Sequence, residues 1–449
     1  MTFRLSCLAK SFICCAVLIC VNTAVFATVT AKVMEESEVF LLTPPDNGSG
    51  PLWSYGCTQI ARLGEDVYIS AMETDPDTPP LCNTKWRLLK HSPEGWKMIS
   101  EDTAVRQREP CPLAVISPDR LAINVNDSLE PKGTKYGRCL PGIRLFHFSD
   151  APHTMTHILP QWKDAPYFTD HSYRSFASDP VNHRLLMFNI DAKTSVEHAC
   201  LLSADGETLA TSSVSFPIRS CYAQTALHDF AAYMLAIGDI VEPVDAWREY
   251  KFEQTERQWD YVFRRLFYTW TPDIRTTPFA DALEIDTVDD TAGYITNQDL
   301  WIDSDGTAWI LYIRFEVQNA LLRDKFFPDK SIDPSLILAQ IDPNGTVHKE
   351  VLVPESPERG ISQAKFQVSA KGHLYAVICL SGEEGGVNIM PLHAHAPDRN
   401  LIPVPLEHPL GSFCLATTRA GNAPSNWIDM FGTTGDNQFR YTSILLEEE

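Results

Sequence analysis

Residues 303–312 read Asp-Ser-Asp-Gly-Thr-Ala-Trp-Ile-Leu-Tyr, a polar turn followed at once by an apolar run of the strand-forming type. The same order of turn and strand recurs along the chain, at 63–69, 117–123, 179–188 and 369–378. The spacing is roughly 50 to 65 residues, which is close to the length of one β-propeller blade. The repeat therefore predicts an all-β fold, a seven-bladed β-propeller built of four-stranded antiparallel blades.

The number of blades depends on how the ring closes. The last repeat begins near Phe413 and has only about three convincing strands, and the early segment 38–42 is placed to supply the fourth. Such closure would join the two ends of the chain and remove the open sheet edge. Six blades remain an alternative, because the fourth repeat is poorly defined, and an open β-sandwich is the alternative fold.

The first 27 residues have the features of a secretory signal. Two basic residues precede the apolar run 11–21, and small residues stand at the expected cleavage position, 25–27. We therefore expect a signal peptide at 1–27 and a single propeller domain at 28–449, in a secreted or periplasmic protein with no stable membrane span after cleavage. An uncleaved anchor is the alternative, although the apolar run is short for a span.

Eight cysteines follow the predicted signal, and an even number in an exported protein predicts disulfides. Neighbours in the sequence are the expected partners, Cys111 with Cys139 and Cys200 with Cys221. The spacing contains no C-x-x-C pair, so we expect no structural zinc site. The sequence predicts no metal site and indicates no particular cofactor.

The chain is strongly acidic, with a formal net charge of −21 that becomes −23 when Arg4 and Lys10 leave with the signal. Such a charge argues against nucleic acid and against anionic membrane surfaces as partners. We expect a monomer that binds a glycan or polysaccharide.

Long insertions fall mainly in one class of connection, between the second and third strands of a blade, at 73–85, 127–142, 238–261 and 315–335. These loops should share one face with the starts of the innermost strands, and long loops on a rigid scaffold commonly carry ligand sites. Surface helices are expected at 245–259 and 319–326. Trp247 and Trp259 are candidates for stacking on sugar rings, and the alternative is that they only pack the insertion.

The starts of the innermost strands carry polar side chains that should converge on the central axis. Arginine offers a planar fork suited to carboxylate or sulfate. We therefore expect an anionic ligand such as a uronate or a sulfated sugar, unless each arginine simply pairs with a nearby acid. The candidate binding residues are Arg106, Arg108, Arg174, Arg219, Arg359 and Gln363.

Two catalytic schemes are open. A hydrolase needs two carboxyl groups across the glycosidic bond, and Glu109, Asp170 and Asp299 are the candidates. A lyase needs a cation for the uronate carboxylate and a base for the adjacent proton. The candidates for that proton transfer are His171, Tyr173 and Tyr222.

The turn-and-strand units resemble the sialidase-like, BNR-type propellers of secreted bacterial proteins. Residues 304–306 followed by Trp309 are similar to an Asp-box, but one residue is missing between Asp and Gly, and 203–206 is a second degraded version. The Phe-Arg-Ile-Pro signature of true sialidases is absent. The resemblance implies a propeller that acts on carbohydrate, and it transfers no catalytic residue.

Together these features predict an exported carbohydrate-active protein that cleaves or trims an anionic glycan, as a glycoside hydrolase or a polysaccharide lyase. The alternative is a non-catalytic propeller that binds a glycan or a protein partner.

Overall fold

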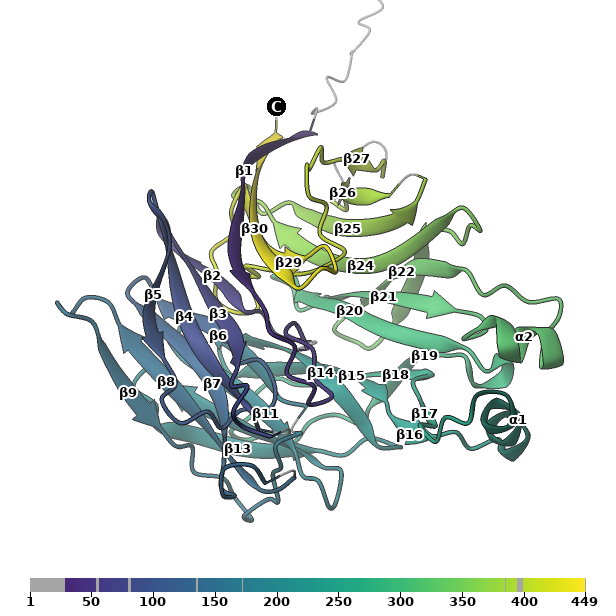
Figure 1. Ribbon diagram of the computed structural model, residues 1–449, viewed down its shortest axis with the longest axis horizontal. Helices are drawn as coiled ribbons and strands as arrows, with labels where there is room; N and C mark the ends of the chain where they lie inside the picture. Colours follow the sequence, from purple (N-terminus) through teal and green to yellow (C-terminus); the bar gives the residue numbers. More distant parts are fainter. Residues whose placement is uncertain are drawn as a thin grey trace, which may run out of the picture.

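The computed structural model describes residues 29–53, 56–79, 82–134, 136–171, 173–383, 385–393 and 399–448. Within this part of the chain seven four-stranded antiparallel sheets are arranged around a common axis, so the predicted seven-bladed propeller is confirmed (Figure 1). No helix in the described residues is long and apolar enough to cross a bilayer. The predicted signal peptide lies outside them.

The first three blades follow the predicted order of strands closely. Blade 1 contains β2 (Ile60–Leu63), β3 (Asp66–Thr74), β4 (Thr84–Ser92) and β5 (Gly95–Glu101). Blade 2 contains β6 (Leu113–Ser117), β7 (Arg120–Ser128), β8 (Cys139–His147) and β9 (Thr154–Ile158). Blade 3 contains β10 (Ser175–Asp179), β11 (Arg184–Ile190), β12 (Glu197–Ser203) and β13 (Thr208–Val214).

The next three blades carry the larger insertions. Blade 4 contains β14 (Ser220–His228), β15 (Ala231–Gly238), β18 (Arg265–Thr271) and β19 (Leu283–Thr287), followed by the 3-10 turn Asp289–Thr291. Blade 5 contains β20 (Tyr294–Ile302), β21 (Ala308–Phe315), β22 (Pro334–Ile341) and β23 (Val347–Val353). Blade 6 contains β24 (Arg359–Val368), β25 (Leu374–Gly382), β26 (Gly386–Pro391) and β27 (Ile402–Pro403).

Blade 7 joins the two ends of the chain. Its inner strands are β28 (Ser412–Leu415), β29 (Trp427–Thr433) and β30 (Gln438–Glu448), and its outermost strand is β1 (Val29–Leu41). The register of β1 on β30 runs from Val29 opposite Glu448 to Leu41 opposite Gln438. The predicted closure is therefore confirmed, with a strand longer than the segment 38–42.

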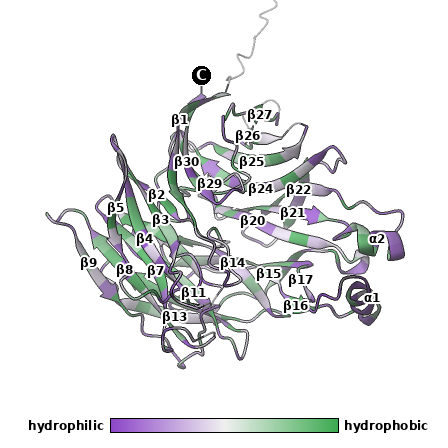
Figure 2. Cartoon of the chain, viewed as in Figure 1, coloured by the Kyte–Doolittle hydropathy of each residue, from purple (hydrophilic) through white to green (hydrophobic). Residues whose placement is uncertain are grey.

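Two short helices lie at the outer edge of the ring, near the places the sequence indicated (Figure 1). The first, α1 (Asp245–Thr255), follows the small strand β16 (Ile240–Val241) and precedes its partner β17 (Tyr261–Val262). It has no buried residue and is mainly hydrophilic (Figure 2). The second, α2 (Ala320–Phe326), is capped by the Asn319 side chain, which accepts a hydrogen bond from the Leu322 backbone N–H.

The hydrophobic core lies between the blades, because each sheet packs its two faces on its neighbours. Strands β6 and β10 are buried along their whole length. Between blades 4 and 5, for example, Tyr268 packs in one cluster with Ile310 and Tyr312. Full burial of each such side chain is worth about 1.5–3 kcal/mol. The ring of interfaces therefore fixes where the strand starts meet at the axis.

The predicted disulfides are wrong, because all eight described cysteines are free, buried thiols. Cys139 Sγ donates to the Thr169 carbonyl over 2.8 Å, and Cys221 Sγ donates to Asp239 over 3.1 Å. Cys200 lies on β12, and Cys221 lies on the innermost strand of the next blade, with β13 between them in the sequence. Nearness in sequence therefore does not bring these thiols together.

The loop 416–426 between β28 and β29, called the axial plug here, crosses the axis and bonds to the innermost strands of all six other blades. Arg62 N–H donates to Asn422, Val115 N–H to Ala420 and Ser178 N–H to Arg419. The other partners of the plug are Thr225 of β14, Asp299 of β20 and Gln367 of β24. The plug therefore ties the ring together at its centre.

Gly421 in the plug gives a test of this packing. Its φ is +81°, and a Cβ added there would lie 2.1 Å from the Val115 carbonyl oxygen. Gly372 has the same φ of +81° in open space, so it is a matched control. We expect Gly372→Ala to cost about 1–2 kcal/mol in the free energy of unfolding, and Gly421→Ala about 2–5 kcal/mol. Urea unfolding measures both, and equal costs would contradict the tight packing.

Candidate functional site

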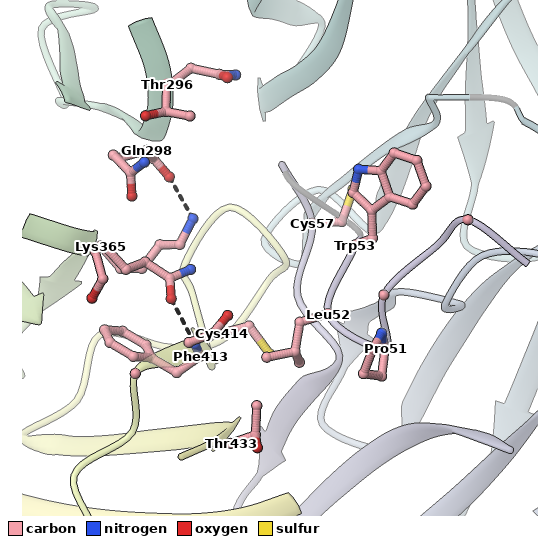
Figure 3. A pocket seen from close by; sticks show the side chains of 17 residues that line it. Pro51, Leu52, Trp53, Cys57, Thr296, Gln298, Lys365, Phe413, Cys414 and Thr433 are labelled. Atoms are coloured by element: carbon pink, nitrogen blue, oxygen red, sulfur yellow. Dashed lines mark hydrogen bonds between the residues drawn. The ribbon is translucent and has the colours of Figure 1, made fainter. Parts of the chain in front are cut away.

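A cavity of about 540 Å³ opens at the axis, on the side where the innermost strands begin. Its wall comes from β20, β24 and β28 on one side and from Gly48, residues 50–53 and Cys57 on the other (Figure 3). The lining is rich in amide and hydroxyl groups suited to a small polar ligand. These groups belong to Thr296, Asn297, Gln298, Ser362, Gln363, Ser412 and Thr433.

Among the described residues that line this cavity, Lys365 is the one that carries a charge. Its Nζ donates to the Gln298 carbonyl oxygen over 2.5 Å. Burial lowers its pKa below the ordinary value, and the charge of Asp299 opposes this shift. Lys365 was not among the residues predicted for the site. The available signal was a lysine within β24, an innermost strand in which Ala364 and Phe366 on either side of it are buried.

Asp299, a predicted catalytic acid, is placed below the cavity in a buried ion pair. Its Oδ1 accepts hydrogen bonds from Arg419 Nη2 at 2.5 Å and from Arg419 Nε at 3.2 Å. Its Oδ2 accepts the Phe366 backbone N–H at 2.9 Å. The side chains of Asp299 and Arg419 are only 2% and 6% exposed. This carboxylate binds the axial plug and is not among the described residues that line the cavity.

Four aromatic rings from three segments of the chain meet beside the cavity. Trp53 lines the cavity, and its ring centroid is 5.0 Å from that of His171 and 6.3 Å from that of Tyr222. The ring centroids of His171 and Tyr173 are 4.2 Å apart, and those of Tyr173 and Tyr222 are 4.7 Å apart. The structure therefore brings together all three residues predicted for proton transfer, and it adds Trp53.

Tyr173 and Tyr222 both have an unusual backbone conformation. Their φ angles are +45° and +53°, in the left-handed region that non-glycine residues seldom adopt. Tyr173 lies just before β10 and Tyr222 lies near the start of β14, and their rings meet edge-on. Backbone strain of this kind is often found at functional sites.

Glu109 and His171 form a hydrogen-bonded pair. His171 Nδ1 lies 2.6 Å from Glu109 Oε1, and the two side chains are 16% and 7% exposed. Burial by itself raises the pKa of Glu109, but the hydrogen bond to His171 and the nearby guanidinium charges of Arg174 and Arg108 bring the pKa below the ordinary value. An ionised carboxylate only accepts hydrogen bonds, so Nδ1 carries the proton and Nε2 is the basic nitrogen.

Arg174 and Arg219, two of the predicted binding residues, support this group of side chains. Arg174 is buried and donates to the carbonyl oxygens of Glu109 at 3.0 Å and Pro110 at 2.6 Å. Arg219 pairs with Asp239, and its guanidinium carbon lies 5.2 Å from the centre of the Tyr173 ring. Burial raises the pKa of Tyr173 well above its ordinary value, so its phenol keeps its proton at neutral pH.

The other predicted arginines do not converge on the cavity. Arg106 donates to the Glu130 carbonyl oxygen, and Arg359 donates to the Pro354 carbonyl oxygen at 3.3 Å. Arg108 pairs with Asp170 at 3.2 Å, and burial raises the pKa of that acid. These contacts correct the prediction that the arginines gather around a ligand. Of the predicted arginines, Arg219 is the one whose guanidinium lies over the ring of a proton-transfer residue, Tyr173.

The remaining predicted residues have different surroundings. Gln363 lines the cavity and accepts the Phe413 backbone N–H at 2.6 Å. Trp247 packs on Phe327 of the other insertion, with ring centroids 5.5 Å apart, which agrees with a packing role. Trp259 is 65% exposed and lies 4.8 Å from the Tyr261 ring.

The sequence matches no known protein family profile and no curated protein. Solved structures with a similar fold are known. The polysaccharide lyase Uly1 has a TM-score of 0.56 at 10% identity, over 92% of this chain and 99% of that one. A PL25 ulvan lyase has a TM-score of 0.55 at 9% identity, over 91% and 95% of the two chains.

The same kind of ulvan lyase has also been solved bound to -[GlcA(1-4)Rha3S]-, with a TM-score of 0.55 at 10% identity, over 90% of this chain and 95% of that one. These neighbours are β-propellers that act on glycans. At such identities the likeness establishes the fold.

Proposed function

We propose that this protein is a polysaccharide lyase that cleaves a uronate-containing glycan by β-elimination. The observation that carries the proposal is the pair Glu109–His171 next to Tyr173, at the edge of a polar cavity. It supplies a basic nitrogen and a protonated phenol on neighbouring side chains. A β-elimination needs these two groups, one to take a proton and one to give a proton.

Hydrolysis fits the same geometry less well. A hydrolase needs two carboxyl groups available on either side of the glycosidic bond. Glu109 is bonded to His171, Asp170 to Arg108 and Asp299 to Arg419. Each of the three candidate acids therefore already has a cation or an imidazole as a partner.

Each proton transfer of the elimination is assigned to one of the named residues. His171 Nε2 takes the proton from C5 of the uronate, and the C4–O4 bond breaks as a C4–C5 double bond forms. Tyr173 gives its phenolic proton to O4 of the leaving sugar, and solvent later returns a proton from the imidazolium to the phenolate. Arg219 is the nearby cation that balances charge developing on the uronate carboxylate. Tyr222 packs edge-on against Tyr173 and fixes its ring.

The comparisons support this proposal. Uly1 and the PL25 ulvan lyase are propellers with TM-scores above 0.5, and one of them was solved with a glucuronate-containing ligand.

The mass of the released fragments tests the proposal directly, because elimination adds no water to them and hydrolysis does. We expect the mature protein, incubated with a panel of uronate polymers with and without sulfate, to release fragments that carry a double bond and no added water. Mass spectrometry and the ultraviolet absorbance of the conjugated double bond measure this. Fragments with an added water would indicate hydrolysis, and no fragments from any polymer would favour a glycan-binding or protein-binding propeller.

The proposal includes export, with a signal peptide at 1–27 and a single propeller domain at 28–449 in a secreted or periplasmic protein. N-terminal sequencing of the protein isolated from its native host tests this. A closer kinship to sialidase-type propellers also remains a proposal. The two degraded Asp-box turns lie at unequal places, 203–206 between the third and fourth strands of blade 3 and 303–306 between the first and second strands of blade 5.

A further inference from the structure

We propose that Lys365 forms a second anion subsite in the axial cavity, which binds the carboxylate or sulfate of a sugar unit next to the one that is cleaved. The inference rests on the proposed function for its polymer context. The evidence for it is the set of charged side chains in and just below the cavity, which have no role in the proposed elimination.

Among the described residues, the cavity lining and the layer just below it together hold one more cation than anion. Lys365 and Arg419 are the two cations, and Asp299 is the acid between them. Both oxygens of Asp299 are occupied, by Arg419 and by the backbone N–H groups of Leu300 and Phe366. Asp299 is therefore committed to Arg419, and the charge of Lys365 is left for a ligand.

The nearby thiols do not change this balance. Cys57 and Cys414 also line the cavity, and burial raises the pKa of each above its ordinary value, so both remain neutral at pH 7. No acidic side chain is among the residues that line the cavity in the described part of the chain. A positive cavity in a chain of net charge −21 favours an anionic group.

The position of the cavity explains why the subsite would hold a neighbouring sugar. Trp53 lies between the two regions, because it lines the cavity and also contacts the rings of His171 and Tyr222. Figure 3 shows Lys365 and Gln298 on one wall and Trp53 on the other. Amide and hydroxyl groups around Lys365 suit sugar hydroxyls. The indicated substrate is a polymer with anionic groups on successive or alternating sugars.

Direct binding tests the subsite without catalysis. The probes are D-glucuronate, D-glucose 6-sulfate and D-glucose, titrated by NMR into the whole mature protein. We expect one or both anionic sugars to bind at least about 10-fold more tightly than glucose, and Lys365→Met to remove that preference. The two anionic probes distinguish a carboxylate from a sulfate ligand. Lys371→Met is the matched control, because Lys371 is exposed and pairs with Glu448.

A second measurement uses the unsubstituted protein, in case Lys365→Met does not fold. Reductive methylation followed by peptide mass mapping reports the accessibility of each lysine amine. We expect the preferred anionic sugar to protect Lys365, glucose to give no protection, and Lys371 to react equally in every sample. Equal reaction of Lys365 with and without the anionic sugars overturns the subsite, as does a folded Lys365→Met protein that binds them normally.

The outcomes separate this inference from the proposed function. Protection of Lys365 in a protein that cleaves no polymer would support the subsite and count against the lyase. Elimination products formed with an unchanged KM by Lys365→Met would support the lyase and overturn the subsite.

Discussion

Replacing His171 by alanine is expected to lower the turnover of the cleaved polymer by about 10²–10⁴-fold, the usual contribution of a positioned acid or base. The reason is geometric, because Glu109 holds the Nδ1 proton and the His171 ring lies 5.0 Å from the ring of Trp53, which lines the cavity. Initial rates from the absorbance of the unsaturated product measure the loss. Polymer binding should change little, because the group removed acts in proton transfer.

Three further variants show whether the lower turnover comes from lost proton transfer rather than from lost binding. Glu109→Gln should reduce turnover by at least about 10-fold, because an amide can donate to Nδ1 and select the wrong tautomer. Tyr173→Phe removes the acid, and adding it to His171→Ala should cost less than the two separate losses combined. His348 is exposed on β23, so His348→Ala is the matched control. Equal loss of binding and turnover in His171→Ala would contradict the assigned role.

Replacing Asp299 by alanine is expected to lower the free energy of unfolding by about 3–5 kcal/mol, the cost of leaving a buried charge without its partner. Arg419 is that charge, and it also donates to the carbonyl oxygens of Gly56 and Thr225 at 2.9 and 3.0 Å. Losing Asp299 would therefore loosen the contact between the axial plug and three other segments. Chemical denaturation followed by tryptophan fluorescence measures the change.

The matched control is the exposed pair of Glu94 and Lys97, whose side chains are 69% and 60% exposed. Glu94→Ala should change the free energy of unfolding far less than Asp299→Ala does, because exposed ion pairs contribute little. The double variant Asp299→Ala, Arg419→Ala should lose less stability than the sum of the single changes. An Asp299→Ala protein of normal stability but without turnover would restore the original prediction that this acid is catalytic.

The blades could be predicted from the sequence because their signals are local. A turn such as 303–306 and the strand after it are neighbours in the chain, so the period appears directly in the residues. Closure by β1 was predictable for a different reason. The last repeat lacked its fourth strand, and the strand-like segment 38–42 belonged to no other repeat. The helices 245–259 and 319–326 were placed correctly, although α1 ends at Thr255.

The site was predictable only where it depends on strand starts. His171, Tyr173 and Tyr222 were grouped because polar side chains at those positions face the axis. Lys365 and Trp53 were missed, because their shared cavity arises from segments far apart in the chain. The arginines were grouped too broadly, since the sequence does not show which of them already have a partner, such as Asp239 for Arg219. The disulfide predictions were wrong for a similar reason, because the sequence does not show which cysteines lie close together in space.

The pairing of β1 with β30 has a consequence for how the protein is made. Thr30 and Glu447 are hydrogen-bonded partners 417 positions apart, and a chain leaves the ribosome from its N-terminus. The first strand therefore has no partner until β30 has been synthesised. The six other blades can assemble before that point, but the ring closes only once β30 is present, and a chain that lacks β30 keeps an exposed sheet edge.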